Sequence, residues 1–584
     1  MIGIRAVSQV AADLPLKGKE EEAVLKKFAV VTICIAFLCV NAMAQDAKTV
    51  IANAQRALGD LKSITYSGTA KDVAFQQCGA NAAESMCKGT HDPMRPIANY
   101  VRVIDLTAPT SRHTGATNNP AGGGATQPMP GTFFAQVTPQ QADVSQPWAG
   151  SVEFYLTPWG FLKGAAANNA TVGKKKVDGN TVLTWSPTVK APSGKNYVIN
   201  GYVNEQNFVV RVETWLGDNI MGDMHIVATY SGWKDFLGVF APTKIVQTRG
   251  GWPYFEVDVT GAKPNPADVA TLAPQPAPAG RGGQGGGAPA GGPPAGGGGG
   301  AGAGGGAGRG GQGGGAVPPA PGGAPAAAPA GGGGRGAQGG AAVPPAPGAP
   351  PAAAGAGGGR GGAPAPLTVT TEMLGDGVWR LTTGPGSYDS LVVNFKDYVM
   401  LLEAGQSEAR ALAYIAEIKK LVPGKPIRYV MNTHPHADHT GGLPAMVAEG
   451  ATIITQKNNE EFFDRALNTP RTLLDDTLAK NPKKAKIESV SGKKVYSDGT
   501  HTVEMYHVSP VPHSNGLLIA FLPKEKVLFQ GDFSLPAEGQ PANDHVKALV
   551  PILEKLNLDF TRYINVHTSA TPQTKGDLLK AVGK

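Results

Sequence analysis

A short stretch in the C-terminal part of the chain carries side chains that could bind a metal ion. Residues 433–442 place four potential ligands within six positions, and these are His434, His436, Asp438 and His439. The chain has only 11 His in 584 residues, so three imidazoles around one carboxylate are hard to ascribe to chance. Zn²⁺ is borderline soft and accepts both nitrogen and oxygen donors. The stretch predicts a zinc-binding loop, and the alternative is a polar surface loop.

The residues that flank this loop predict the elements that position it. Residues 427–432 form an apolar run of β-formers, which predicts a buried strand that presents the loop at its carboxyl end. We expect Gly441 and Gly442 to let the backbone turn closely around an ion, before residues 443–449 begin a helix.

The pattern His-x-His-x-Asp-His after a strand resembles the signature of the metallo-β-lactamase-fold hydrolases. The family's later positions follow in order: His513 before an apolar run, Asp532 after residues 527–531, and His567 after residues 562–566. The resemblance covers residues 367–584 and implies an αββα sandwich. It places one Zn²⁺ on His434, His436 and His513 and a second on Asp438, His439 and His567, with Asp532 bridging the two ions.

Several other residues near this pattern need a separate interpretation. His507 also follows a strand-like run and is the alternative to His513, which we prefer because the turn after it leads into the next strand in the family's order. Glu403 stands where the family often has Asp, so the resemblance implies a supporting role with a longer reach. We interpret His501 and His545 as solvated loop residues.

Such a site implies hydrolysis of a small-molecule substrate. Two Zn²⁺ about 3.5–4 Å apart can hold a bridging hydroxide and lower the pKa of its parent water toward roughly 7. Asp438 is the predicted catalytic residue, because its carboxylate can orient the nucleophile and handle its proton. Asp532 favours ester, thioester, lactone or phosphoester substrates, with a lactam also considered. The alternative function is a lipid- or envelope-binding protein whose metal domain is structural or vestigial.

Residues 45–265 predict a separate β-rich domain. Residues 47–58 have helical periodicity and end at Gly59, and six runs between residues 182 and 259 alternate like antiparallel strands. This pattern resembles the LolA-like lipoprotein-carrier half-barrel, which implies a groove for a lipid or acyl chain. The alternative is that the aromatic side chains of the sheet simply form its core, and these are Trp185, Tyr202, Phe208 and Trp215.

Residues 266–366 predict a disordered linker, because from residue 274 onward they are almost all Gly, Ala and Pro and contain no acidic or aromatic residue. The formal net charge of +7 is spread along the chain, and nucleic acid is therefore not an expected partner.

Residues 1–44 predict an export signal. Two lysines precede the apolar run 28–40, and Ala42-Met43-Ala44 offers a cleavage site before Gln45. The residues upstream of position 24 suggest a misassigned start. We expect a periplasmic or secreted bacterial protein without a transmembrane helix in the mature chain, and an uncleaved anchor is the alternative. In an oxidising compartment Cys78 and Cys87 could form a disulfide, with two free thiols as the alternative.

Overall fold

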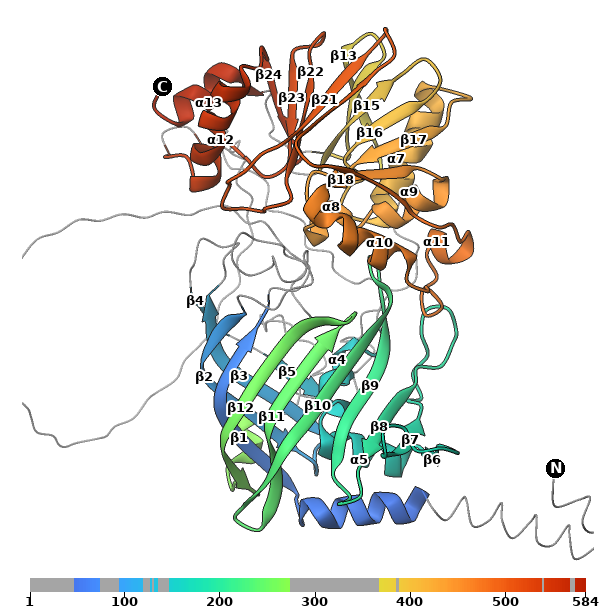
Figure 1. The fold of residues 1–584 in the computed structure, drawn as a ribbon, viewed down its shortest axis with the longest axis vertical. Coiled ribbons are helices and arrows are strands. Elements are labelled where there is room, and N and C mark those ends of the chain that lie inside the picture. Colours follow the sequence, from blue (N-terminus) through green and yellow to red (C-terminus); the bar gives the residue numbers. More distant parts are fainter. Residues whose placement is uncertain are drawn as a thin grey trace, which may run out of the picture. The chain divides into compact units, whose positions relative to one another are not determined.

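The computed structural model of the protein describes residues 47–73, 94–118, 126–128, 131–134, 147–273, 367–384, 388–537, 540–567 and 573–584 (Figure 1). The predicted export signal, Cys78, Cys87 and the low-complexity residues 274–366 lie outside these ranges. Within them, every helix is too short or too polar to pass through a lipid bilayer.

A large antiparallel sheet forms most of the N-terminal part. Its strands are ordered β4-β3-β2-β1-β12-β11-β10-β9-β8-β7-β6, and β5 pairs with β3. All six strands predicted between residues 182 and 259 overlap observed ones, so the expected β-rich region is confirmed. The bounds are β1 (Ser63–Asp72), β2 (Arg95–Asp105), β3 (Thr110–Asn118), β4 (Thr126–Pro128), β5 (Gly131–Phe134), β6 (Thr171–Val172), β7 (Thr181–Trp185), β8 (Ile199–Val203), β9 (Val209–Asp218), β10 (Gly222–Phe236), β11 (Val239–Arg249) and β12 (Trp252–Pro264).

Helices pack against this sheet. The predicted helix over residues 47–58 is confirmed, and Gly59 follows it with a φ of +93°, a left-handed conformation that suits glycine after a helix end. Two unpredicted helices are α4 (Ala149–Tyr155) and α5 (Pro158–Ala167). Helix α5 approaches the sheet so closely that a Cβ on Gly164 would stand 2.2 Å from the ring of Trp185. The sheet ends near helix α6 (Val269–Leu272), so the predicted boundary at residue 265 falls between β12 and α6.

Four aromatic side chains of this sheet were candidates for either its core or a ligand groove, and two of them are buried. Trp185 and Tyr202 have exposed fractions of 3% and 6%. Phe208 and Trp215 are half-buried, and their rings stack on Trp233 and His225. The resemblance of this region to lipoprotein carriers stays a prediction.

Two further sheets form the C-terminal part. The first runs in the order β13-β14-β15-β16-β17-β18-β19, and the second in the order β20-β21-β22-β23-β24-β25. The bounds of the first are β13 (Thr370–Gly375), β14 (Val378–Thr382), β15 (Asp389–Asn394), β16 (Val399–Leu402), β17 (Ile427–Met431), β18 (Thr452–Gln456) and β19 (Lys486–Val490). Those of the second are β20 (Lys493–Ser497), β21 (Thr502–His507), β22 (Leu518–Leu522), β23 (Val527–Gln530), β24 (Arg562–Asn565) and β25 (Gln573–Thr574).

The two C-terminal sheets share one apolar core. Leu391 and Met431 of the first sheet and Met505 and Phe529 of the second belong to the same buried cluster. The opposite faces are covered by helices (Figure 1). The helices near the first sheet are α7 (Glu408–Leu421), α8 (Ala437–Thr440), α9 (Leu443–Glu449), the 3₁₀ turn η2 (Lys457–Asn459), α10 (Glu460–Asn468) and α11 (Thr477–Lys480). Those near the second are α12 (Asp544–Leu556) and α13 (Lys575–Ala581).

Candidate metal centre

The His-rich loop follows the carboxyl end of strand β17, as predicted. The strand pairs in parallel with β16 and β18, and its residue Met431 is fully buried. Three residues later the chain reaches His434, and the short helix α8 begins at Ala437 directly after His436. The imidazoles of His434, His436 and His439 are almost fully buried, with exposed fractions of 2% or less.

Gly441 and Gly442 have a different role from the one expected. Their φ angles are −59° and −87°, so neither residue needs the conformational freedom of glycine. Instead, the backbone of a neighbouring segment leaves no room for a side chain at either position. A Cβ added to Gly441 would lie 1.9 Å from the carbonyl oxygen of Gln406, and one added to Gly442 would lie 2.3 Å from that of Ala404. The predicted helix at residues 443–449 is confirmed as α9.

One group of potential ligands surrounds His434. Its Nε2 lies 3.0 Å from Nδ1 of His436 and 3.0 Å from Nε2 of His513, and Oδ2 of Asp532 lies 3.0 Å from His513 Nε2. A ring nitrogen carries at most one hydrogen, so His434 Nε2 cannot donate to both neighbours at once. Nitrogens bound to one tetrahedral zinc ion stand about 3.3–3.4 Å apart, so this convergence suits a shared cation.

A second group lies beside the first. Nε2 of His439 and Nε2 of His567 are 3.2 Å apart, and both face Oδ2 of Asp438 at 3.5 and 3.4 Å. The other carboxylate oxygen of Asp532, Oδ1, lies 2.9 Å from His439 and 3.0 Å from His567. The two oxygens of one carboxylate therefore face two separate sets of imidazoles.

The electrostatic surroundings of these groups favour a cation. Burial and the neighbouring His439 lower the pKa of His434 well below its usual value, so this imidazole is neutral and can act as a ligand. Burial alone would raise the pKa of Asp532, but the imidazoles outweigh it and hold that pKa well below the ordinary range. Burial would lower the pKa of His439, yet Asp532 and Asp438 reverse the direction and raise it. The carboxylates of Asp438 and Asp532 thus favour a positive charge beside His439.

Glu403 supports the loop from behind, as the resemblance implied. It directly follows β16 with a φ of +73° and is fully buried. Its Oε2 accepts hydrogen bonds from the hydroxyl of Thr433 at 2.6 Å and from the Thr433 backbone N–H at 3.3 Å. With its only proton donated to Glu403, the Thr433 hydroxyl oxygen can accept from Nδ1–H of His434, 3.1 Å away. That bond leaves the lone pair of His434 Nε2 facing the centre of the site.

Replacing Glu403 with Gln should weaken zinc binding without removing a ligand. The amide keeps the side-chain volume but loses the negative charge that orients Thr433, and partners of this kind are worth about 10–100-fold in metal affinity. Competition with a chromophoric chelator would measure the change. The matched control is Glu372→Gln, since Glu372 is exposed and, among the described residues, pairs with Arg380 of the same sheet. Equal zinc affinity in the two variants would contradict the role assigned to Glu403.

Tyr388 belongs to the site, although sequence reasoning missed it. Its hydroxyl donates a hydrogen bond to Oδ2 of Asp438 at 3.0 Å, and its ring lies 4.8 Å from that of His567. Burial and the carboxylate of Asp438 raise the pKa of Tyr388 far above its usual value, so the hydroxyl stays protonated. Tyr388 pairs with His567 in an isolated antiparallel bridge, and this contact between distant residues left no local signal in the sequence.

The remaining histidines divide as follows. His513 lies in the first group, whereas its alternative His507 ends strand β21 and contacts the backbone oxygen of Asn515 at 2.9 Å. His501 was expected to be solvated, but it is buried beside Glu525, so that prediction is wrong. His545 was expected in a loop and instead lies in α12, half-buried, with its ring 4.8 Å from that of His513.

The residues brought together fit a pair of zinc ions. They provide only imidazole nitrogens and carboxylate oxygens, a ligand set that Zn²⁺ accepts. In the part of the chain that the structure describes, these groups contain no thiolate. The two groups comprise His434, His436, His513 and Asp532, and Asp438, His439 and His567.

The C-terminal region is similar to known proteins. Residues 383–570 match the family model of the Metallo-beta-lactamase superfamily. A curated relative, the 2,4-dinitroanisole O-demethylase subunit alpha of Nocardioides sp. (strain JS1661), is 21% identical over 165 residues, which are 28% of this chain. The alignment spans 46% of that relative, less than half its length.

Two solved structures are also similar to this region. The metallo-beta-lactamase from Pontibacter korlensis is 18% identical, and the match covers 36% of this chain and 95% of that one with a TM-score of 0.28. The DIM-1 metallo-beta-lactamase exposed to ceftazidime is 18% identical, and the match covers 36% of this chain and 94% of that one with a TM-score of 0.27.

Proposed function

We propose that the protein is an exported, zinc-dependent hydrolase of a small-molecule ester, thioester, lactone, lactam or phosphoester, and the match of residues 383–570 to the Metallo-beta-lactamase superfamily model supports this proposal. The observation that supports this proposal most directly is the position of Asp532, whose two oxygens lie within 3.0 Å of imidazoles in two separate groups. One carboxylate shared in this way suits a bridge between two cations. Such a pair of cations can activate a water molecule for hydrolysis.

Each side chain of the site has a proposed task. His434, His436 and His513 would hold one zinc ion and Asp438, His439 and His567 the other, with Asp532 shared. When bound, the zinc ions supply Lewis acidity that makes water a nucleophile near neutral pH. Asp438 orients the attacking water and accepts its proton, and the hydroxyl of Tyr388 fixes the direction of that carboxylate. No Ser or Cys nucleophile is required.

The purified full-length protein should bind close to two zinc equivalents, because seven ligands converge in two groups. Elemental analysis after zinc loading and desalting would measure the stoichiometry. His507→Ala should retain both equivalents, since His507 lies outside the groups, whereas His513→Ala should lose at least one. One equivalent or fewer in the unmodified protein would remove the two-metal proposal.

Export is the second part of the proposal. Ala42 and Ala44 supply the small side chains that a signal peptidase selects, after an apolar run of about thirteen residues that is short for a membrane span. Protein purified from its native host should therefore begin at or near Gln45. N-terminal sequencing would measure this, and retention of residues 28–40 would point to an anchor instead.

The substrate can be narrowed by a panel that includes each class named above. Lactones, thioesters, phosphodiesters and β-lactams test the proposed bond types, each with and without added zinc. The name of one relative adds 2,4-dinitroanisole to the panel. If no compound is turned over although two zinc ions are bound, the alternative of an envelope-binding protein with a structural metal domain takes precedence.

A further inference from the structure

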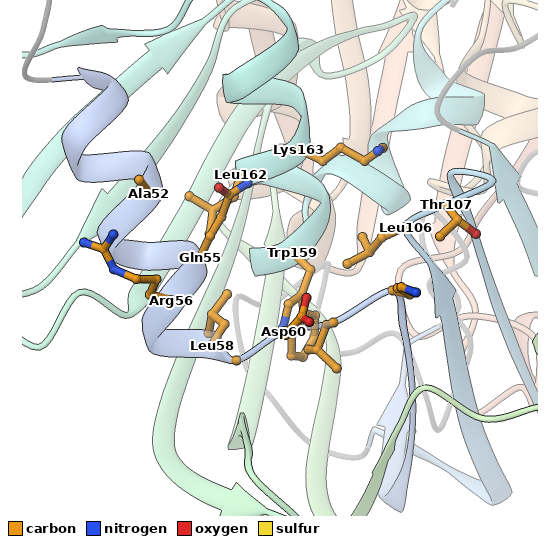
Figure 2. A pocket seen from close by; sticks show the side chains of 13 residues that line it. Ala52, Gln55, Arg56, Leu58, Asp60, Leu106, Thr107, Trp159, Leu162 and Lys163 are labelled. Atoms are coloured by element: carbon orange, nitrogen blue, oxygen red, sulfur yellow. The ribbon is translucent and has the colours of Figure 1, made fainter.

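A cavity of about 690 Å³ lies in the N-terminal part, between the helix at residues 47–58 and helix α5 (Figure 2). Its volume falls within the range of roughly 300–1,000 Å³ that small-molecule sites occupy. Leu58, Trp159 and Leu162 line it and are buried, with exposed fractions of 4% or less. Leu106, which directly follows β2, adds a further apolar wall. The inner surface is therefore suited to a hydrocarbon group.

The rim of the cavity carries an excess of positive charge. Arg56 and Lys62 are exposed and Lys163 is half-buried, and all three line the cavity together with a single carboxylate, Asp60. The formal charge of these four side chains is 3 − 1 = +2. None of the three cations forms an ion pair with any residue that the structure describes. Three cations left without carboxylate partners at the edge of an apolar cavity favour an anionic group there.

A buried hydrogen-bond donor in the wall points to a ligand as well. The indole N–H of Trp159 is buried and finds no acceptor among the described residues, while the ring packs against Tyr66 with 6.4 Å between centroids. Buried donors in folded proteins are nearly always satisfied by a protein group, a water molecule or a ligand. An oxygen atom of a bound molecule would satisfy this donor.

From these observations we propose that the cavity binds a single-chain amphiphile with an anionic head group, its chain against Leu58, Trp159 and Leu162 and its head near Lys62 and Lys163. The site is separate from the metal centre and does not depend on the proposed hydrolase activity. Both carboxylate and phosphate head groups provide the required charge and oxygen acceptors, so the shared chemistry is an anion joined to an apolar chain.

Calorimetric titration of the full-length protein with dodecanoate, below its critical micelle concentration, would test the proposal. We expect saturable binding of one molecule per chain, with affinity rising about tenfold for every two methylene groups between octanoate and dodecanoate. Dodecyl phosphate distinguishes the two head groups, and either anion binding more tightly than dodecanol supports the site. Dodecyltrimethylammonium should bind most weakly of the four.

Variants of the cavity make the test specific to it. The double variant Lys62→Glu/Lys163→Glu should weaken dodecanoate binding by at least about tenfold and leave dodecanol binding nearly unchanged. Its matched control is Lys174→Glu/Lys175→Glu, which reverses two exposed charges of the same domain.

Ala52→Trp, which fills part of the cavity, should weaken the binding of every ligand, whereas Asp438→Ala at the metal centre should alter the binding of none. The proposal is overturned if dodecanoate fails to bind, if the alcohol binds as tightly as the anion, or if the cavity variants bind like the unmodified protein.

Discussion

Replacing Asp438 with Ala should lower zinc-dependent turnover by well over the roughly 10²-fold typical of losing a positioned acid–base group. Asp438 is a proposed ligand of the second zinc ion and the acceptor of the hydrogen bond from Tyr388. Its loss therefore removes a metal ligand and the group that handles the proton, while His434, His436 and His513 keep the first site. The fold should survive, because Asp438 lies in the short helix α8 after β17 and not in the core that the two sheets share.

Steady-state kinetics on whichever compound of the substrate panel is turned over would measure this loss. Asp559→Ala is a suitable control, since Asp559 is largely exposed and forms its ion pair with Lys526, away from both groups of the metal centre. The rate of this variant should match that of the unmodified protein. Circular dichroism on all three proteins would show that the fold is retained. A rate for Asp438→Ala within a few-fold of the control would exclude the proposed role.

Replacing Glu153 with Ala should destabilise the N-terminal part by about 3–5 kcal/mol, the usual effect of removing one partner from a buried ion pair. Glu153 of helix α4 is buried, and its Oε1 accepts hydrogen bonds from Arg249 at 2.8 Å and Gln247 at 3.0 Å. Arg102 donates to the backbone oxygen of Glu153 at 2.8 Å and is also buried. Without the carboxylate, both buried guanidinium groups would lose the ion pair that they form with Glu153.

Scanning calorimetry of the full-length protein, monitoring the transition of the N-terminal part, would measure this effect. Glu205→Ala provides the matched control, because Glu205 forms an ion pair with Lys176 at 3.6 Å in the same domain but both side chains are exposed. That variant should lose about 0–1 kcal/mol. A small loss for Glu153→Ala as well would show that the buried network does not stabilise the native state.

The same carboxylate predicts a dependence on pH. Burial would raise the pKa of Glu153, but Arg249 and Arg102 outweigh it and lower that pKa below the value in the unfolded chain. Its contribution to stability is therefore present above the unfolded pKa and is lost as the pH falls through the folded pKa. The difference in stability between the unmodified protein and Glu153→Gln should accordingly shrink on acidification.

The metal centre could be predicted in large part from the sequence, because most of its ligands are local. His434, His436, Asp438 and His439 lie within six residues, so a single loop brings them together. Asp532 and His567 each lie two residues after a short strand, β23 and β24 respectively. Their order along the chain matches the order of the ligands in the metallo-β-lactamase-fold hydrolases, and this resemblance implies that they share one site.

Contacts between distant residues could not be predicted in this way. Tyr388 meets Asp438 across 50 residues, and Glu153 meets Arg249 across 96, through sheet pairing and helix packing that no local pattern encodes. Helix α5 was missed because Gly160 and Gly164 disfavour a helix by propensity. Packing overrides that preference, since the ring of Trp185 leaves no room for a side chain at position 164.

Each group of the metal centre takes its side chains from both C-terminal sheets. His434, His436, Asp438 and His439 follow a strand of the first sheet, whereas His513, Asp532 and His567 come from loops of the second. Neither sheet alone provides all the ligands of a group, so a bound cation would cross-link the two sheets at the edge where they meet. Bound zinc would then hold the two sheets together. Both the activity and the free energy of unfolding should therefore increase with the concentration of free zinc.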